Sequence, residues 1–134
     1  MMSFDGKMSG KQTTDSIAEF VKLHPRIYVE ELTSTIVNGR IKYVLGARIA
    51  NDNLVAHSAK NQTWPALQNV AVTLSYPTSG VGKQVTYVAI QVDQTSNFGQ
   101  AYVTGGGLYQ RSISIVVEAY TTKFLNYDAQ IYGV

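Results

Sequence analysis

Apolar and polar residues alternate with a period of two along most of the chain. From Arg26 onward, segments rich in β-branched and aromatic residues follow one another, separated by turn-forming residues. They read IYVEEL, GRIKYVLGARI, NLVAHSA, NVAVTLSY, KQVTYVAIQV, QAYVT, SISIVVEAY and YDAQIYG. In SISIVVEAY, alternate residues from Ile113 to Ala119 are apolar, whereas Ser112, Ser114 and Glu118 share the other face. The pattern predicts an all-β fold, an antiparallel β-sandwich or flattened barrel of about eight strands.

A helical pattern occurs only near the N-terminus. In TTDSIAEFVKLHP, Asp15 or Ser16 can cap a helix, and Glu19 follows Ser16 at capping-box spacing. Pro25 ends the helix at about His24. Residues 1–12 are small and polar, which is typical of a flexible tail. We therefore predict a tail plus one short amphipathic helix over residues 1–25, followed by a β-sandwich domain over residues 26–134.

Glycines mark several expected turns. Asn38-Gly39 lies between two strand-like runs and predicts a two-residue hairpin turn. Gly105–Gly107 precede SISIVVEAY, and we expect them to turn the chain through positive φ rather than to cradle a ligand. Gly82-Lys83 lacks the earlier glycine, the following Ser or Thr and the helix of a phosphate-binding loop, so it also indicates a turn.

Composition limits the classes of partner. The chain has 11 Lys+Arg against 9 Asp+Glu, a net charge of +2, without a basic run, which does not favour direct contact with nucleic acid. It has no cysteine, so neither a disulfide nor a cysteine zinc site is possible. No apolar run reaches the roughly 18 residues of a membrane span, and we expect no transmembrane segment.

No pattern of side chains predicts catalysis, a cofactor or a metal site. His24 and His57 lack the spacing that places two ligands on one helical face, and no G-x-S-x-G motif is present. The carboxylates are best interpreted as surface charges. We expect a protein that is not an enzyme; a hydrolase would require His57 to share a cleft with Glu118 or Asp128.

Candidate binding residues lie in expected loops. Trp64, in NQTWPAL, is either a binding anchor or a packing residue. Asn61 begins an N-x-Thr glycosylation acceptor, which matters only in a secreted chain. Tyr109 and Arg111 follow the three glycines and join Trp64 as a possible interaction surface.

Three motifs carry a family resemblance: YVLGAR, the Gly106-Gly107 pair and the final IYG. Their matching residues are Tyr43, Leu45, Gly46, Arg48, Gly106, Gly107, Ile131, Tyr132 and Gly133. From about Tyr43 to Gly133 the chain resembles the insect multiprotein bridging factor two family, which includes response-to-pathogen and salivary-secreted-peptide-like proteins. Tyr109 and Phe124 stand where typical members carry glycines.

The resemblance implies a role in binding protein partners. The first hypothesis is a secreted, extracellular insect protein of defence or stress response. The alternative is a nuclear transcription coactivator that bridges a DNA-bound factor and the general transcription machinery.

Two further expectations come from the strand pattern itself. The strands could close into a barrel around a small apolar ligand, which would make the chain a carrier. Their edges, rich in Tyr, Val and Ile with few charges, also predict a possible homo-oligomer.

Overall fold

The computed structural model describes residues 2–3, 5–9 and 30–134, and this part of the chain is all-β. The strands are β1 (Met2–Ser3), β2 (Asp5–Ser9), β3 (Glu30–Glu31), β4 (Thr33–Val37), β5 (Arg40–Gly46), β6 (Asn53–Tyr76), β7 (Val85–Gln94), β8 (Gly99–Gly106) and β9 (Ile113–Gly133). The described residues form no helix that could span a membrane. The helix expected before Pro25 lies outside them, and the domain boundary after residue 25 stays a prediction. β1 and β2 fall within the stretch expected to be a tail.

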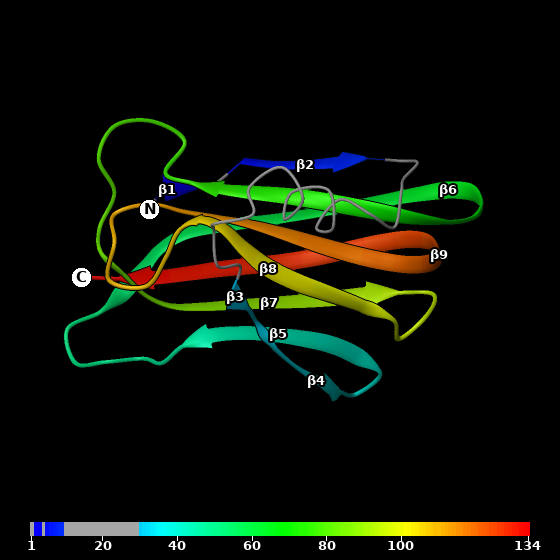
Figure 1. Cartoon of the computed structure of the whole chain (residues 1–134), viewed down its shortest axis with the longest axis horizontal. Helices are drawn as coiled ribbons and strands as arrows, with labels where there is room; N and C mark the ends of the chain where they lie inside the picture. The colour runs from blue at the N-terminus through cyan, green and yellow to red at the C-terminus, as the bar shows by residue number, and fades with distance from the viewer. Residues whose placement is uncertain (1, 4, 10–29) are drawn as a thin grey trace.

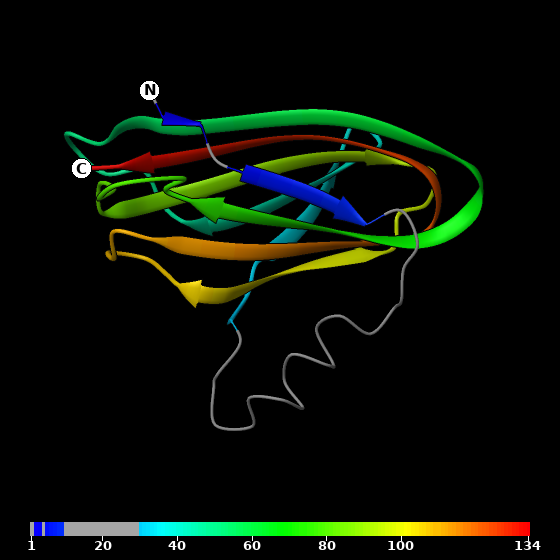
Figure 2. The ribbon, with the colours of Figure 1, turned by 90° about the horizontal axis from the view of Figure 1, so that it is seen from above.

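Two long strands, β6 and β9, organise the fold (Figures 1 and 2). They pair antiparallel, with an interruption between Thr63 and Gln68 of β6, opposite Phe124 and Thr122 of β9. Both strands bend there. The first half of β6 pairs with the second half of β9, and the second half of β6 pairs with the first half of β9. Each long strand therefore contributes to two layers, which Figure 2 shows one above the other.

The remaining strands extend the two layers. The first layer runs in the order β1, β6, β9, β7, β5, β4. In the second layer, β2 pairs with the second half of β6, β8 with the first half of β9, and β3 with β8. The chain crosses between layers at buried Leu32, whose N–H donates to the Ala101 carbonyl at 2.9 Å. The predicted all-β class is confirmed, as a nearly closed, antiparallel, barrel-like sandwich.

The sequence pattern separates NLVAHSA from NVAVTLSY, but the structure joins them within β6. The polar, proline-containing stretch between them looks like a loop and is instead the bend of one strand. In the same way SISIVVEAY and YDAQIYG are the two halves of β9, which bends where Thr121 has a φ of 53°. A strand can bend in this way where its ladder is interrupted by unpaired residues.

The hairpin expected at Asn38-Gly39 is confirmed. Val37 pairs with Arg40, and the two turn residues have φ values of 52° and 78°. Positive φ at both positions is the mark of a type I′ turn, which matches the twist of the strands on either side.

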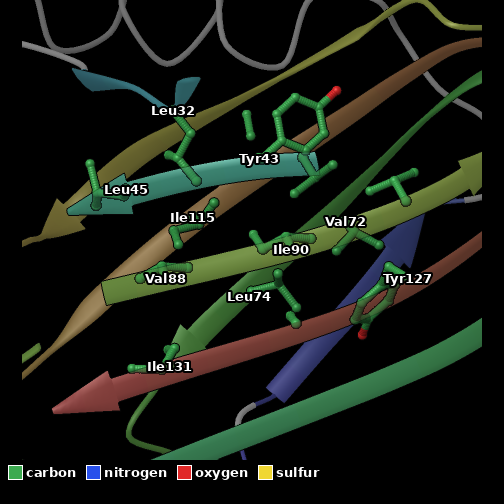
Figure 3. Packing of buried hydrophobic residues seen from close by; sticks show 14 of the residues in the cluster. Leu32, Tyr43, Leu45, Val72, Leu74, Val88, Ile90, Ile115, Tyr127 and Ile131 are labelled. Carbon is green, nitrogen blue, oxygen red and sulfur yellow. The ribbon is translucent and has the colours of Figure 1, made fainter. Parts of the chain in front are cut away.

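Alternate residues of the strands fill the interior between the layers. On β9, odd-numbered residues point inward both before and after the bend, so the bend does not exchange the inward and outward positions. Figure 3 shows Val88, Ile90 and Ile131 of the first layer facing the same interior as Leu74 and Ile115 of the second. Burial of each such side chain contributes roughly 1.5–3 kcal/mol to stability. Buried side chains from both layers thus point into the interior, where an apolar ligand would have to sit.

Candidate functional site

Three loops gather at the end of the sandwich opposite the bend (Figures 1 and 2). They connect β5 to β6, β6 to β7 and β8 to β9, and we call this surface the loop end. The N–H of Tyr109 donates to the Val85 carbonyl at 2.7 Å, and the N–H of Val85 donates to Gln110 at 2.9 Å. The N–H of Ala47 donates to Thr86 at 3.2 Å. These bonds fix two of the loops against the start of β7, so side chains there are preorganised.

Glycines permit the close approach of these loops. Gly46 has a φ of 76°, and a Cβ at that position would lie 2.4 Å from the Thr86 carbonyl oxygen. Gly106 has a φ of 63°, and a Cβ there would lie 2.1 Å from the carbonyl oxygen of Ser112. Gly107 has a φ of 150°, whereas Gly105 remains within β8 without a positive φ. The expected turning role is confirmed for Gly106 and Gly107.

The β5–β6 loop is held by one buried carboxylate. Asp52 accepts hydrogen bonds from Arg48 Nε at 2.8 Å, from the Ile49 N–H at 2.8 Å and from Thr86 Oγ1 at 3.1 Å. Burial alone raises the pKa of Asp52, but the hydrogen bonds from Ile49, Arg48 and Thr86 and the charge of Arg48 outweigh it, so the pKa is lowered. The carboxylate thus stays ionised and fixes the direction of the arginine.

Arg48 extends from this anchor over an aromatic ring. Its guanidinium carbon lies 3.8 Å from the centre of the Tyr132 ring, which is cation–π geometry. Tyr132 in turn packs against Tyr87, with ring centres 5.8 Å apart. Beside these rings a polar hollow of about 410 Å³, which Lys42 and Gln130 also line, opens on the outer face of the first layer.

Exposed apolar side chains stand on the same loops. Tyr109 is 63 % exposed and has a φ of 63°, a conformation that costs a side-chain-bearing residue about 1–2 kcal/mol. Residues held in such conformations tend to gather at binding sites. The exposed large apolar residues of the three loops are Ile49, Val81 and Tyr109.

A family model described as transcription activator MBF2 matches residues 45–133. The chain belongs to the MBF2 family. The match spans the Arg48 anchor, the β8–β9 loop and the last strand, so it includes the Gly106-Gly107 pair, the final IYG and YVLGAR from Leu45 onward, while Tyr43 precedes it. No curated protein and no solved structure matches the chain. Insect origin and a response to pathogens stay predictions.

The residues expected at an interaction surface do not all meet in this MBF2 chain. Tyr109 and Arg111 share the β8–β9 loop, where Arg111 donates to the Gly82 carbonyl at 3.1 Å and so also tethers the β6–β7 loop. Trp64 lies at the bend, half-buried against the core. Asn61 is exposed on β6. Only the first two therefore belong to the loop end.

The sequence patterns missed Asp52 and the apolar residues Ile49 and Val81 as members of the site. Asn51-Asp52-Asn53 looks like an ordinary turn. One signal was present, because Arg48 and Asp52 are opposite charges four residues apart beside a family motif. The third partner, Thr86, is far along the chain and gives no local sign.

The His–acid pair considered for a hydrolase does form. His57 Nε2 lies 3.1 Å from Asp128 Oδ1, and both side chains are substantially exposed on the outer face of the first layer. Glu118 lies in the other half of β9 and is not part of this pair. Ser58, next to His57, faces the opposite side of the strand, where its Oγ lies 3.3 Å from the Tyr127 hydroxyl. The described residues contain no group of three or more His, Asp and Glu that could hold a metal ion.

Proposed function

We propose that this MBF2 chain is a non-enzymatic protein-binding domain that acts as a transcription coactivator and contacts its partner through the loop end. The observation that carries the proposal is Tyr109, an exposed aromatic residue held with positive φ on loops that backbone hydrogen bonds fix in place. Exposed aromatic residues on a rigid surface are frequent anchors of protein interfaces. The family description, transcription activator, supports the coactivator role.

The surroundings of the His57–Asp128 pair support the part of the proposal that assigns no enzyme activity to the chain. His57 and Asp128 stand on an open, wet sheet face, where water screens their interaction and competes for their hydrogen bonds. The nearest hydroxyl along the chain, that of Ser58, points to the other face. The filled interior likewise favours a binding surface on the outside over a ligand carrier.

A reporter assay tests the binding surface. The chain is fused to a DNA-binding domain, and transcription of a reporter gene is compared for the wild type, Tyr109→Gly, Val81→Lys and Leu67→Lys. Leu67 is 51 % exposed but lies at the bend, so Leu67→Lys is the matched control. We expect Tyr109→Gly and Val81→Lys to lower activation at least fivefold and Leu67→Lys to leave it unchanged. Full activation by both loop-end variants contradicts the proposal.

Tyr109→Gly also separates lost binding from lost folding. Glycine adopts positive φ without strain, so the stability of this variant is expected to stay equal or to rise by up to about 1 kcal/mol. A fall in activation together with an unchanged melting temperature would assign the defect to the surface.

The second candidate function is a secreted defence protein, and exposed Asn61 is the observation that favours it. The acceptor Asn61-Gln62-Thr63 lies on the surface of β6, where a glycan has room. Intact-mass measurement of the native protein, with identification of its first residue, tests this candidate. A processed N-terminus with an N-glycan at Asn61, linked through N-acetylhexosamine, supports secretion and contradicts the nuclear role. An unmodified chain that keeps its initiator Met supports the coactivator.

A further inference from the structure

β4 is the last strand in the order of the first layer. Within the described part of the chain, β4 pairs with β5 on one side, and no strand pairs with its other side. All five residues of β4, TSTIV, are exposed and none of them is charged. Natural proteins usually protect such an edge with charges, proline or a bulge, because its free N–H and C=O groups can pair with another strand.

The edge also exposes apolar side chains. Ile36 pairs with buried Ile41 and so shares the core-facing side of the sheet, yet it remains 54 % exposed, and Val37 is 48 % exposed. Among the described strands, the second layer ends at β3 beside β8, and none of its strands pairs with β4. A further strand beside β4 would cover Ile36.

The turn geometry shows which backbone groups of β4 are free. In a two-residue hairpin the residues flanking the turn, here Val37 and Arg40, exchange backbone hydrogen bonds. Alternation then directs the backbone groups of Val37, Thr35 and Thr33 toward β5. The N–H and C=O groups of Ser34 and Ile36 point outward.

We propose that β4 pairs antiparallel with β4 of a second copy of this chain, with the two-fold axis at Thr35. In this register Ser34 of each copy lies opposite Ile36 of the other, and each such pair exchanges both backbone hydrogen bonds. In this register all five residues of β4 have a partner, and the free N–H and C=O groups of one copy lie opposite the free groups of the other. The two Ile36 side chains become diagonal neighbours on the core-facing side. Such an isologous contact closes as a dimer.

Charge at the ends of β4 favours the antiparallel arrangement. Exposed Glu30 and Glu31 precede the strand, and exposed Arg40 follows the turn at its other end. Antiparallel pairing brings the acidic end of one copy to the Arg40 end of the other, whereas parallel pairing would oppose glutamates to glutamates. Unlike charges across an interface favour one orientation over the other.

Disulfide trapping tests the register, because the chain has no cysteine of its own. Thr35 would face its own copy as a non-hydrogen-bonded pair, with Cα atoms about 4.5 Å apart, close enough for a disulfide. Thr33 is the matched control: it lies on the same face, but the two Thr33 residues would be roughly 13 Å apart. Under mild oxidation, Thr35→Cys is expected to form dimers at least tenfold faster than Thr33→Cys.

Sedimentation equilibrium provides a readout without engineered cysteines. A contact of this size belongs to the weak class of interfaces, so half of the chains should be dimeric at a concentration on the order of 100 μM. Ile36→Lys should weaken association at least tenfold, whereas Leu67→Lys, of similar exposure at the bend, should not. Equal trapping of Thr35→Cys and Thr33→Cys, or a monomer at about 1 mM, would overturn the proposal and leave the edge to a strand from another protein.

Discussion

Asp52 holds the β5–β6 loop by accepting three hydrogen bonds, from Arg48, Ile49 and Thr86, at one carboxylate. Loss of that carboxylate would leave the buried Thr86 hydroxyl without this acceptor, which costs more than the net value of the bond itself. At the same scale, Gly46 lets the loop pass close to the Thr86 carbonyl. The structure of the loop end therefore depends on Asp52 and Gly46, which both lie against Thr86 of β7.

Gly46→Ala should be strongly destabilising. The new Cβ would stand 2.4 Å from a backbone oxygen, at a φ of 76°. Gly80→Ala is the matched control, because Gly80 has a φ of 68° but no atom within 4 Å of the position of a Cβ. By urea unfolding we expect a loss of about 3 kcal/mol for Gly46→Ala and about 1 kcal/mol for Gly80→Ala. Equal losses would mean that the close contact is relieved by movement of the loop.

Asp52 should make stability depend on acid pH. Its pKa is lower in the folded chain than the ordinary value of 3.8, so the folded protein binds the proton less readily than the unfolded chain. The stabilisation is complete above about pH 4 and is lost as the pH falls through the lower, folded pKa. Asp52→Asn removes this component, and the stability difference from wild type should shrink on acidification. A difference that stays constant from pH 6 to pH 2 contradicts the assignment.

Local residue patterns predicted some of these features and not others. Gly106 and Gly107 were interpretable because glycine clusters before a strand have few other uses. Asp52 was not, because its role depends on Thr86 in another strand. Tyr109 was selected as a surface residue, but no local pattern contains its positive φ or the hydrogen bond that its N–H donates to the distant Val85 carbonyl.

At the scale of elements, two segments that the sequence pattern separates, NLVAHSA and NVAVTLSY, belong to the single bent strand β6. Periodicity identified both halves of β6 and both halves of β9, since their apolar positions alternate. It could not show that each pair of halves is continuous. In β6, Pro65 and the polar residues beside it look like a loop, and in β9 the alternation is interrupted near Thr121. The short strand β4 was anticipated only as the run before the Asn38-Gly39 turn, since its first residues, Thr33 and Ser34, are polar and exposed.

Trp64 should stabilise the bend rather than bind a partner. It is half-buried and packs against the core cluster. Trp64→Ala is expected to lower the free energy of unfolding by about 2 kcal/mol, less than for a fully buried tryptophan. Leu67→Ala, at an exposed neighbouring position, should change it by less than about 0.5 kcal/mol. If Trp64→Ala loses reporter activation at a temperature where the variant is fully folded, Trp64 binds the partner, and this prediction is wrong.

At the scale of the whole molecule, the two layers share their central strands. β6 and β9 each belong to both layers, so neither layer can unfold and leave the other intact. The period of two predicted the sandwich class correctly. The near closure of the sandwich depends on pairings such as that of β7 with β9. These strands are far apart in the sequence, so no local pattern predicts that they pair.

The sandwich should accordingly unfold in one cooperative transition. Fluorescence of Trp64 at the bend and far-ultraviolet circular dichroism should give the same midpoint in urea. Val72→Ala in the second layer and Val88→Ala in the first should each lower that one midpoint, by a free energy of about 1.5–3 kcal/mol. Separate midpoints for the two probes, or a second transition in either variant, would show that the layers unfold independently.

The bend also offers a place to attach a reporter. Pro65, Ala66 and Leu67 are exposed and have no partner on β9, so extra residues there would lengthen the bend without shifting the register of either half. The loop end lies at the opposite side of the sandwich, and the β4 edge belongs to another margin. The anisotropy of a fluorescent label inserted after Pro65 would thus report the rotation of the whole domain and its binding to a partner. Both proposed contact surfaces would stay unmodified.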